Sequence, residues 1–374
     1  SSLMGRINYS FDSRYLFTFT VRRDGSSVFG SNNKYGTFPS VAVGWNIANE
    51  KFMEHTNSWL NTLKLRLSYG KAGNEAISVY ETLLKLNVEK FAMGGGSVVG
   101  LIPSTRMDNK NLSWETTKTF NIGIDFGFLN NRITGNIDFY TSTTDGLLLR
   151  RRLPNLSGYA DVYANMGKTA NRGIELTVNS RNIDVNGFTW NTGLVFSWNH
   201  NEIKDLYGDK QDDLGNRWFI GQPIGVIYDY EKVGIWQEDE IERGDHLKWD
   251  PVAEPGDVKL ADRNGDGQIN DDDRYVQGQT TPKWNGGLTN TFSYKGFTLN
   301  IFLNTVQGHK QWNRLLSIAG DEMGRRNQTT EIGYWTAENR SNEFRSLSKS
   351  SNKHGYGYAQ DASFWRIKDI TLSY

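Results

Sequence analysis

Apolar and polar residues alternate along segments of about ten residues, and this pattern constrains the chain more than any other feature. In residues 119–128 every second residue is apolar, and polar residues or glycine stand between: Phe120, Ile122, Ile124, Phe126 and Phe128 against Asn121, Gly123, Asp125 and Gly127. Successive side chains of a strand point to opposite faces, so the pattern predicts a strand with one apolar face. After the turn at 129–132 it resumes at Ile133, Ile137 and Phe139, which predicts a hairpin.

The same unit recurs along the chain. We expect further hairpins at 7–21, 174–198 and 288–303, and a final strand at 364–374. Residues 41–47 pair with 63–69 across a short connection that we expect to be helical near 57–61. The pattern predicts about eleven strands. Their second face carries Asn, Gly, Thr, Ser and Asp, as a watery lumen allows.

The connections between these strands are of two kinds. Short turns alternate with long polar segments at 24–38, 71–113, 142–172, 199–285 and 307–363. Short periplasmic turns and long extracellular loops are the layout of an outer-membrane barrel. The predicted fold class is therefore all-β, a transmembrane antiparallel β-barrel with long extracellular loops. Residues 1–374 form part of one barrel domain, and 199–285 are a long extracellular loop segment. Aromatics at several strand ends suggest interfacial girdles: Tyr9, Phe11, Trp45, Trp190, Trp198 and Tyr294.

A soluble β-sandwich or β-propeller is the alternative fold, since its strands also alternate. The mean hydropathy is low, at −0.60, and no run approaches the roughly 18 apolar residues of a membrane helix. Barrel strands escape that test because only one face is apolar. The predicted strands exceed the five or six residues usual in globular sheets. No period of about 40 to 50 residues indicates propeller blades. We therefore favour the membrane barrel.

Several functional classes are disfavoured by composition. Lysine plus arginine number 42 and aspartate plus glutamate number 42, so the net charge is zero and gives no reason to expect nucleic acid as a partner. The chain has no cysteine, which excludes disulfides and thiolate metal sites. We find no nucleophile elbow, paired-carboxylate motif or HExxH spacing, so we expect no catalytic residue, no organic cofactor and no enzyme activity. The run Arg150-Arg151-Arg152 is more easily read as a solvated loop or a lipopolysaccharide contact than as a nucleic-acid site.

The sharpest local motif lies at residues 262–273, within the long segment 199–285. It matches the spacing of a calcium loop, with oxygen ligands at positions 1, 3 and 5, glycine at 6 and a carboxylate at 12. The predicted Ca²⁺ ligands are the side chains of Asp262, Asn264, Asp266 and Asp273 and the backbone carbonyl of Gln268. We expect a structural role that rigidifies the segment. The alternative is a polar turn without metal.

Particular segments, in the same order along nearly the whole chain, resemble the SusC/RagA family of TonB-linked outer-membrane transporters. They are Arg6–Phe11, Arg14–Leu16, Arg22–Gly30, Phe38–Trp45, Leu63–Asn74, Trp114–Thr117, Asn171–Leu176 and Phe364–Tyr374. The resemblance implies a 22-stranded barrel with a lumenal plug, in the outer membrane of a Bacteroidota-type bacterium. It also implies import of glycans or peptides with a SusD-like surface lipoprotein, driven by the TonB complex. About eleven strands would be half of that barrel, with the plug domain and the TonB box absent from this chain.

Two other functions stay open at this point. One is a passive porin or a structural, adhesive outer-membrane barrel without energised transport. The other is a secreted, soluble carbohydrate-binding β protein. The tryptophans of the long segments could stack on sugar rings or pack the loops against a capping lipoprotein: Trp218, Trp236, Trp312 and Trp335.

Overall fold

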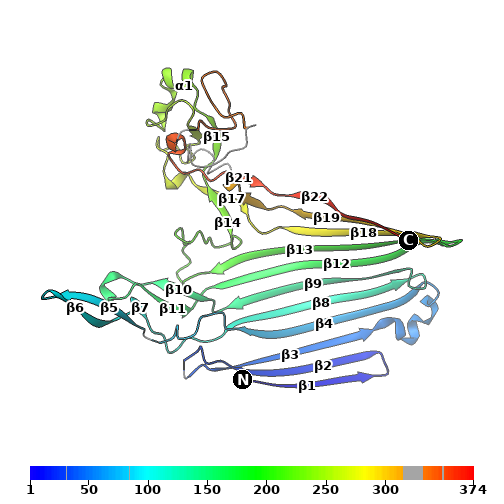
Figure 1. Ribbon diagram of the computed structural model, residues 1–374. Coiled ribbons are helices and arrows are strands. Elements are labelled where there is room, and N and C mark those ends of the chain that lie inside the picture. The colour runs from blue at the N-terminus through cyan, green and yellow to red at the C-terminus, as the bar shows by residue number, and fades with distance from the viewer. Residues whose placement is uncertain (31, 84, 315–331, 348) are drawn as a thin grey trace. The chain divides into compact units, whose positions relative to one another are not determined.

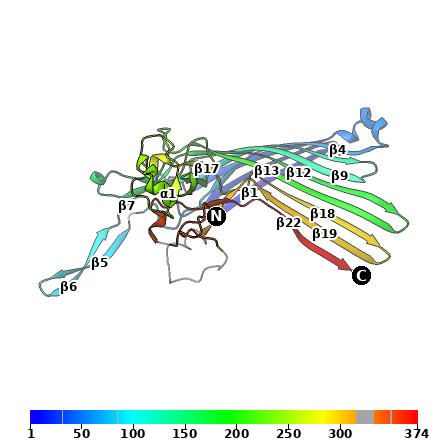
Figure 2. The same cartoon turned by 90° about the horizontal axis from the view of Figure 1, so that it is seen from above.

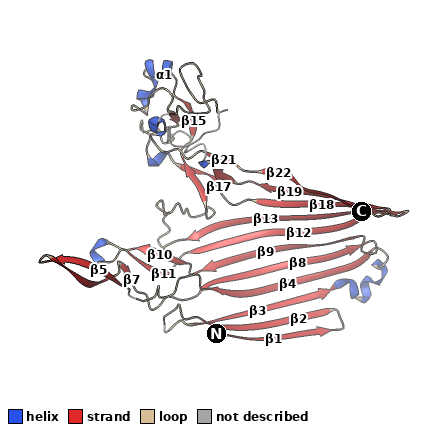
Figure 3. Cartoon of the chain, in the orientation of Figure 1, coloured by secondary structure: helices blue, strands red, loops and turns tan. Residues whose placement is uncertain are grey.

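One large antiparallel sheet of eleven strands dominates the computed structural model, which describes residues 1–30, 32–83, 85–314, 332–347 and 349–374 (Figures 1 and 3). The strands follow the chain order from one edge of the sheet to the other: β1 (Ser2–Phe11), β2 (Tyr15–Gly25), β3 (Tyr35–Asn46), β4 (Leu60–Asn74), β8 (Glu115–Phe128), β9 (Ile133–Asp145), β12 (Lys168–Val185), β13 (Phe188–Asp205), β18 (Trp284–Tyr294), β19 (Phe297–Gln307) and β22 (Phe364–Ser373). Figure 2 shows the same succession from a second side. The all-β barrel-type fold predicted from the sequence is confirmed.

The predicted hairpins form in the expected register. Phe128 at the end of β8 faces Ile133 at the start of β9, and Phe11 faces Tyr15 across the first turn. Two tight turns have positive φ at both central residues, 50° and 78° at Asn186-Gly187 and 47° and 88° at Lys295-Gly296. Such turns match the right-handed twist of the flanking strands, and glycine adopts the second position without strain. Local turn chemistry therefore helps to fix the register that the alternation requires.

Strand pairing gathers the alternating residues into rows across the sheet. One row consists of directly paired apolar residues from five neighbouring strands: Leu65, Ile124, Ile137, Leu176 and Phe196. The adjacent row lies on the opposite face and contains Arg66, Gly123, Asp138, Glu175 and Ser197. We call these two sides the apolar face and the polar face of the sheet. A shift of one residue in register would exchange them, so the pattern specifies the pairing.

The two faces differ in what their side chains contact. On the polar face Arg66 lies 2.9 Å from Asp125 and 2.9 Å from Asp138, and Asn136 donates a hydrogen bond to Asp138. On the apolar face large side chains stay open, with Phe120 44% and Phe139 43% exposed. A contiguous exposed apolar face is costly in water, whereas hydrocarbon covers it without penalty.

The connection between β3 and β4 differs from the prediction. Its helical turns are η1 (Ile47–Asn49) and η2 (Lys51–Thr56), and β4 already begins at Leu60. The carboxylate of Glu50, between the two turns, accepts hydrogen bonds from Arg14, Tyr15 and Trp45. These bonds to residues of β2, β3 and the first turn hold the helical segment early in the connection. The prediction of a helix near 57–61 is therefore wrong, because the helical turns end at Thr56 and the predicted range overlaps the start of β4.

The long connections contain small sheets of their own, which the alternation did not reveal. Between β4 and β8 lies the hairpin of β5 (Leu86–Met93) and β6 (Gly96–Pro103). The strands β7 (Arg106–Met107), β10 (Leu148–Arg152) and β11 (Asp161–Asn165) form a three-stranded sheet, and η3 (Asn155–Ser157) joins β10 to β11. The strands β12 and β13 reach 18 residues each, well beyond the predicted ends.

Residues 225–282 and 306–364 form a separate compact unit, which we call the loop unit. The part 315–331 of the predicted connection 307–363 lies outside the described residues. The elements of the loop unit are β14 (Val226–Asp229), β15 (Lys232–Ile235), α1 (Glu238–Glu242), η4 (Asp245–Lys248), β16 (Val258–Leu260), η5 (Asp271–Asp273), β17 (Tyr275–Gln279), β20 (Lys310–Trp312), η6 (Lys349–Asn352) and β21 (Ala359–Asp361). Its buried core is Tyr230, Ile235, Val258, Leu260 and Tyr358. Among the described residues no helix has the length and hydrophobicity needed to cross a membrane.

Candidate functional site

The predicted calcium loop lies in the loop unit, between β16 and β17. Asp262 is its first residue, and its carboxylate accepts hydrogen bonds from the backbone N–H groups of Gly265 at 2.8 Å and Gly267 at 2.9 Å. Gly267 has φ +82°, a left-handed conformation that glycine adopts freely. The glycine at position 6 of the motif therefore allows a tight bend of the loop.

The remaining predicted ligands are held by hydrogen bonds within the same loop. Asp266 accepts from the side chain of Asn264 at 3.0 Å, which lowers the pKa of its carboxyl, and from the backbone N–H of Gln268 at 2.9 Å. Asp273 is fully buried, and its two oxygens accept from the backbone N–H groups of Arg263 at 2.8 Å and Asn270 at 2.9 Å. Each carboxylate thus already has backbone or side-chain donors.

These residues have the right chemistry for Ca²⁺ but do not converge on one point. Within the described part of the chain no three Asp, Glu, His or Cys side chains are grouped closely enough to hold a metal ion. Oxygen donors at this spacing suit Ca²⁺. A carboxylate has about four lone-pair sites, so Asp262, Asp266 and Asp273 could bind a cation and keep these donors if their side chains moved together. Calcium binding therefore stays a prediction.

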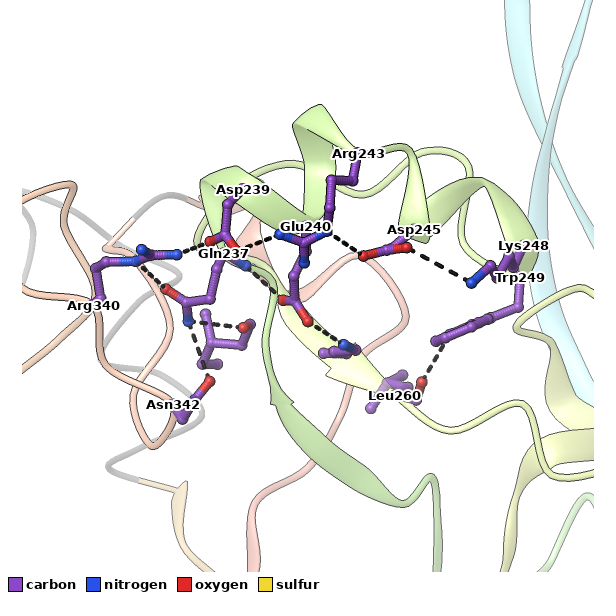
Figure 4. Close-up of polar contacts among 12 residues, drawn as sticks. Gln237, Asp239, Glu240, Arg243, Asp245, Lys248, Trp249, Leu260, Arg340 and Asn342 are labelled. Carbon is purple, nitrogen blue, oxygen red and sulfur yellow. Dashed lines mark hydrogen bonds and ion pairs between the residues drawn. The ribbon is translucent and has the colours of Figure 1, made fainter.

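Gln237 is a second polar centre of the loop unit, and sequence analysis missed it (Figure 4). Its side-chain nitrogen lies within hydrogen-bond distance of the Ile235 carbonyl at 2.9 Å and of Asn342 at 3.2 Å. Its side-chain oxygen accepts from the indole of Trp335 at 2.9 Å. Only 9% of the residue is exposed. One buried amide therefore joins the segments 225–282 and 306–364.

Ion pairs surround this amide at the surface of α1. Arg340 contacts Asp239 from the other segment, and Arg243 reaches Asp239 at 2.7 Å. Lys259 lies 2.6 Å from Glu240 and 4.2 Å from the centre of the Trp236 ring. Burial is the largest single influence on Glu240 and opposes its ionisation, but the hydrogen bonds from Lys259 and the Gln237 N–H, together with the charges of Lys259 and Arg243, lower the pKa of the carboxyl. The network orders α1 and fixes it to the segment that carries Arg340.

A third contact between the two segments is buried more deeply. Asp257 is 4% exposed, and its carboxylate lies 2.8 Å from the ammonium group of Lys353 and accepts the Glu254 N–H at 2.8 Å. Burial raises the pKa of Asp257 despite these partners. Beside it His354 contacts Asp250, which is 3% exposed, at 3.1 Å. No local motif marks these partners, because they stand about a hundred residues apart in sequence.

The four tryptophans considered for sugar stacking have different surroundings. Trp236 is fully buried, with its ring 5.6 Å from that of Trp249, so it is part of the packing of the loop unit and cannot meet a ligand. Trp335 packs against the buried core. Trp218 and Trp312 are half-buried. The proposal of sugar stacking is therefore wrong for Trp236.

The geometry described so far is an eleven-stranded sheet with one apolar face, joined by short turns and long connections. A family model described as TonB dependent receptor-like, beta-barrel matches residues 1–374. The chain belongs to this family. The resemblance stated from the sequence is thereby confirmed, and the chain is part of an outer-membrane protein of the Bacteroidota type. The family is one of transporters and receptors rather than of enzymes.

Individual relatives match over the whole chain. TonB-dependent receptor P3 of Formosa agariphila is 36% identical over 386 residues, covering 100% of this chain and 38% of that protein. TonB-dependent receptor SusC of Bacteroides thetaiotaomicron is 34% identical over 397 residues, covering 100% of this chain and 37% of that protein. The structure of the RagAB peptide importer in its open-open state matches with a TM-score of 0.80 at 28% identity, covering 99% of this chain and 40% of that one. The chain thus spans about two fifths of the relatives it matches.

Membership of the family indicates which face of the sheet contacts lipid and which face lines the barrel interior. In outer-membrane barrels the outer face contacts lipid and the inner face lines a polar interior. The apolar face with Phe120 and Phe139 is then the lipid-facing side, and the polar face with Arg66 points inward. In such barrels the longer connections are extracellular, and the assignment of 199–285 to the extracellular side stays a prediction.

Proposed function

We propose that this chain forms part of the barrel wall of a TonB-dependent importer of glycans or peptides. The family match over all 374 residues is the observation that carries the proposal. The named activities of relatives point the same way, since SusC is a TonB-dependent receptor and RagAB is a peptide importer. The chain itself contributes lipid-facing wall, polar lining and extracellular loops.

We further propose that a SusD-like surface lipoprotein caps the importer and that the TonB complex supplies energy from the inner membrane. Support comes from the SusC and RagAB relatives. The long extracellular connections offer ample surface for such a partner, because the loop unit alone takes up residues 225–282 and 306–364. Lipids of the outer membrane contact the apolar face.

The decisive experiment measures uptake in the native host. Cells that express the full-length protein should accumulate a labelled cargo, and deletion of tonB should abolish that accumulation. A tagged protein should also copurify with one surface lipoprotein. Uptake that continues at the same rate without TonB would contradict the proposal and favour a passive porin. A structural or adhesive barrel would show no uptake in either strain.

A further inference from the structure

The apolar face of the sheet changes in character toward the long connections. Register aligns the five neighbouring strands β4, β8, β9, β12 and β13 (Figure 1) in rows of directly paired residues. One row of this face is wholly apolar: Leu67, Ile122, Phe139, Ile174 and Trp198. From that row to the short turns, the described residues of this face in these strands carry no charged side chain. The charges that these strands place on the apolar face therefore all lie on the side of the long connections.

Five cationic side chains lie at that end of the face, and we call them the basic belt: Lys71, Lys118, Lys168, Arg172 and Lys204. Lys71 faces Lys118 directly across β4 and β8. Two positions separate Lys71 from Tyr69, Lys118 from Phe120 and Arg172 from Ile174, so each cation shares the face of its apolar neighbour.

Carboxylates neutralise only part of the basic belt. Asp145 lies 3.2 Å from both Lys118 and Lys168, and Glu202 lies 2.7 Å from Lys204. Asp205 stands opposite Lys168, and its carboxylate accepts the backbone N–H groups of Leu206 at 2.9 Å and Gly208 at 3.2 Å. Three carboxylates thus stand against five cations.

The positive charge of Lys71 and Arg172 is not matched by a carboxylate partner. Within the described residues neither side chain has a hydrogen bond or an ion pair. Like charges directly opposite each other on neighbouring strands destabilise a sheet, and Lys71 and Lys118 are such a pair. Thr143, opposite Lys118 on β9, adds a hydroxyl to the same row. An anion between the two lysines would remove their repulsion.

The basic belt lies at the depth where lipid headgroups begin. A membrane-spanning strand takes about 9–11 residues at a tilt of about 45°. On β8 this length runs from Phe128, at the short turn, to Lys118. Lys118 and its neighbours in the belt therefore meet headgroups, while the row of Ile122 stays in hydrocarbon. With the long connections outside, as in outer-membrane barrels, this leaflet is the outer one.

We propose that the basic belt binds the phosphorylated sugar head of lipid A, the anionic lipid of the outer leaflet. Lys71 and Lys118 hold one phosphate, since ammonium groups bind phosphate as point charges. Arg172 stands two strands and one row from Lys118, roughly 12 Å by strand spacing and rise, and its planar fork binds a second phosphate. The acyl chains then lie along the apolar row of Ile122 and Phe139. This lipid contact is separate from cargo binding and from import.

The test measures lipid binding to the full-length protein, purified in detergent and stripped of lipid. Native mass spectrometry follows titrations with bis-phosphorylated lipid A, dephosphorylated lipid A and phosphatidylglycerol. The variant is Lys71→Gln with Arg172→Gln. The control is Lys34→Gln with Lys90→Gln, which removes two charges at exposed residues outside the large sheet. A second variant, Lys71→Arg with Arg172→Lys, keeps both charges.

We expect the Lys71→Gln, Arg172→Gln variant to bind bis-phosphorylated lipid A at least about tenfold more weakly than wild type, because two charge-assisted contacts are lost. The control and the charge-keeping variant should bind it within about threefold of wild type, a difference of less than one charge-assisted hydrogen bond. Dephosphorylated lipid A should bind all four proteins equally weakly. Circular dichroism checks that every variant keeps the strand content of the wild type.

Equal binding of bis-phosphorylated lipid A by wild type and the Gln variant would overturn the inference. Phosphatidylglycerol bound as tightly as lipid A, and lost in the same variant, would overturn the assignment to lipid A. Failure here is distinct from failure of the proposed function, because the assay needs neither TonB nor cargo. A passive porin with this wall would bind the lipid equally well.

Discussion

Replacement of Lys353 by methionine should strongly destabilise the loop unit against local opening, because it removes the positive charge that pairs with Asp257. The two groups lie 2.8 Å apart, with side chains 22% and 6% exposed. Methionine keeps most of the length of the lysine stem and removes only its charged end. The Asp257 carboxylate would then stay buried with the Glu254 N–H as its remaining donor.

The expected cost follows from the burial of the pair. Breaking a buried ion pair by removing one partner costs about 3–5 kcal/mol. Lys353 retains some contact with solvent, so we expect the lower end, about 3 kcal/mol of the free energy that opens the loop unit. Replacing both partners, with Asp257→Asn and Lys353→Met, should recover part of this loss because no unpaired charge remains.

The cost should also depend on pH. Burial raises the folded-state pKa of Asp257, and loss of Lys353 should raise it further. A carboxyl with a raised folded pKa stabilises the fold fully below its unfolded pKa of about 4, and this contribution is lost as pH rises through the folded value. The loop unit of the Lys353→Met variant should therefore be least stable relative to wild type near pH 8, and the difference in opening free energy should shrink as the pH falls toward 4.

Hydrogen–deuterium exchange of the full-length protein, read on peptides covering residues 250–260 and 345–360, measures this local opening. The matched control is Lys248→Met, whose partner Asp245 is 3.7 Å away and whose side chain is 69% exposed. The control should change the opening free energy by less than about 1 kcal/mol. Equal exchange in wild type and Lys353→Met at pH 8 would refute the reasoning.

The remaining predictions concern the other two polar centres of the loop unit. If the predicted loop binds calcium, calorimetric titration of the full-length protein should show one site that Asp262→Asn and Asp266→Asn each weaken; no heat of binding at millimolar Ca²⁺ would end the hypothesis. Replacing Gln237 by leucine leaves the indole N–H of Trp335 without its acceptor. We therefore expect the opening free energy of the loop unit, measured by hydrogen–deuterium exchange, to fall by about 1–3 kcal/mol. Exchange at the wild-type rate would show that this buried amide does not join the two segments.

The sequence was sufficient to predict the strands of the large sheet, because their pairing is local and periodic. The hairpin at 119–139 needs only the two-residue alternation and a polar turn, and its register matches, with Phe128 facing Ile133. Each such strand pairs with a neighbour next to it in chain order over most of the sheet. The fold class followed from this pattern, and the family from the resemblance of particular segments such as Arg22–Gly30 and Trp114–Thr117.

The loop unit was beyond such reasoning because its contacts are not local. Gln237 meets Trp335 and Asn342, and Asp257 meets Lys353, across about a hundred residues with no periodic signal between them. Trp236 illustrates the same limit, since its exposure depends on the distant packing that buries it. The 262–273 motif correctly put a glycine where the loop has positive φ, at Gly267, but spacing alone does not reveal which donors its carboxylates accept.

The most direct test of the membrane wall is a cysteine scan of β8 in the full-length protein. The chain contains no cysteine, so single labels from Phe120 to Phe128 have no competing thiol within it. Spin labels on the protein in lipid bilayers would report collisions with oxygen, which concentrates in lipid, and with a water-soluble nickel complex. We predict high oxygen access at Phe120, Ile122, Ile124 and Phe126 and low access at the residues between. Equal access at successive positions would contradict a wall with one lipid-facing side.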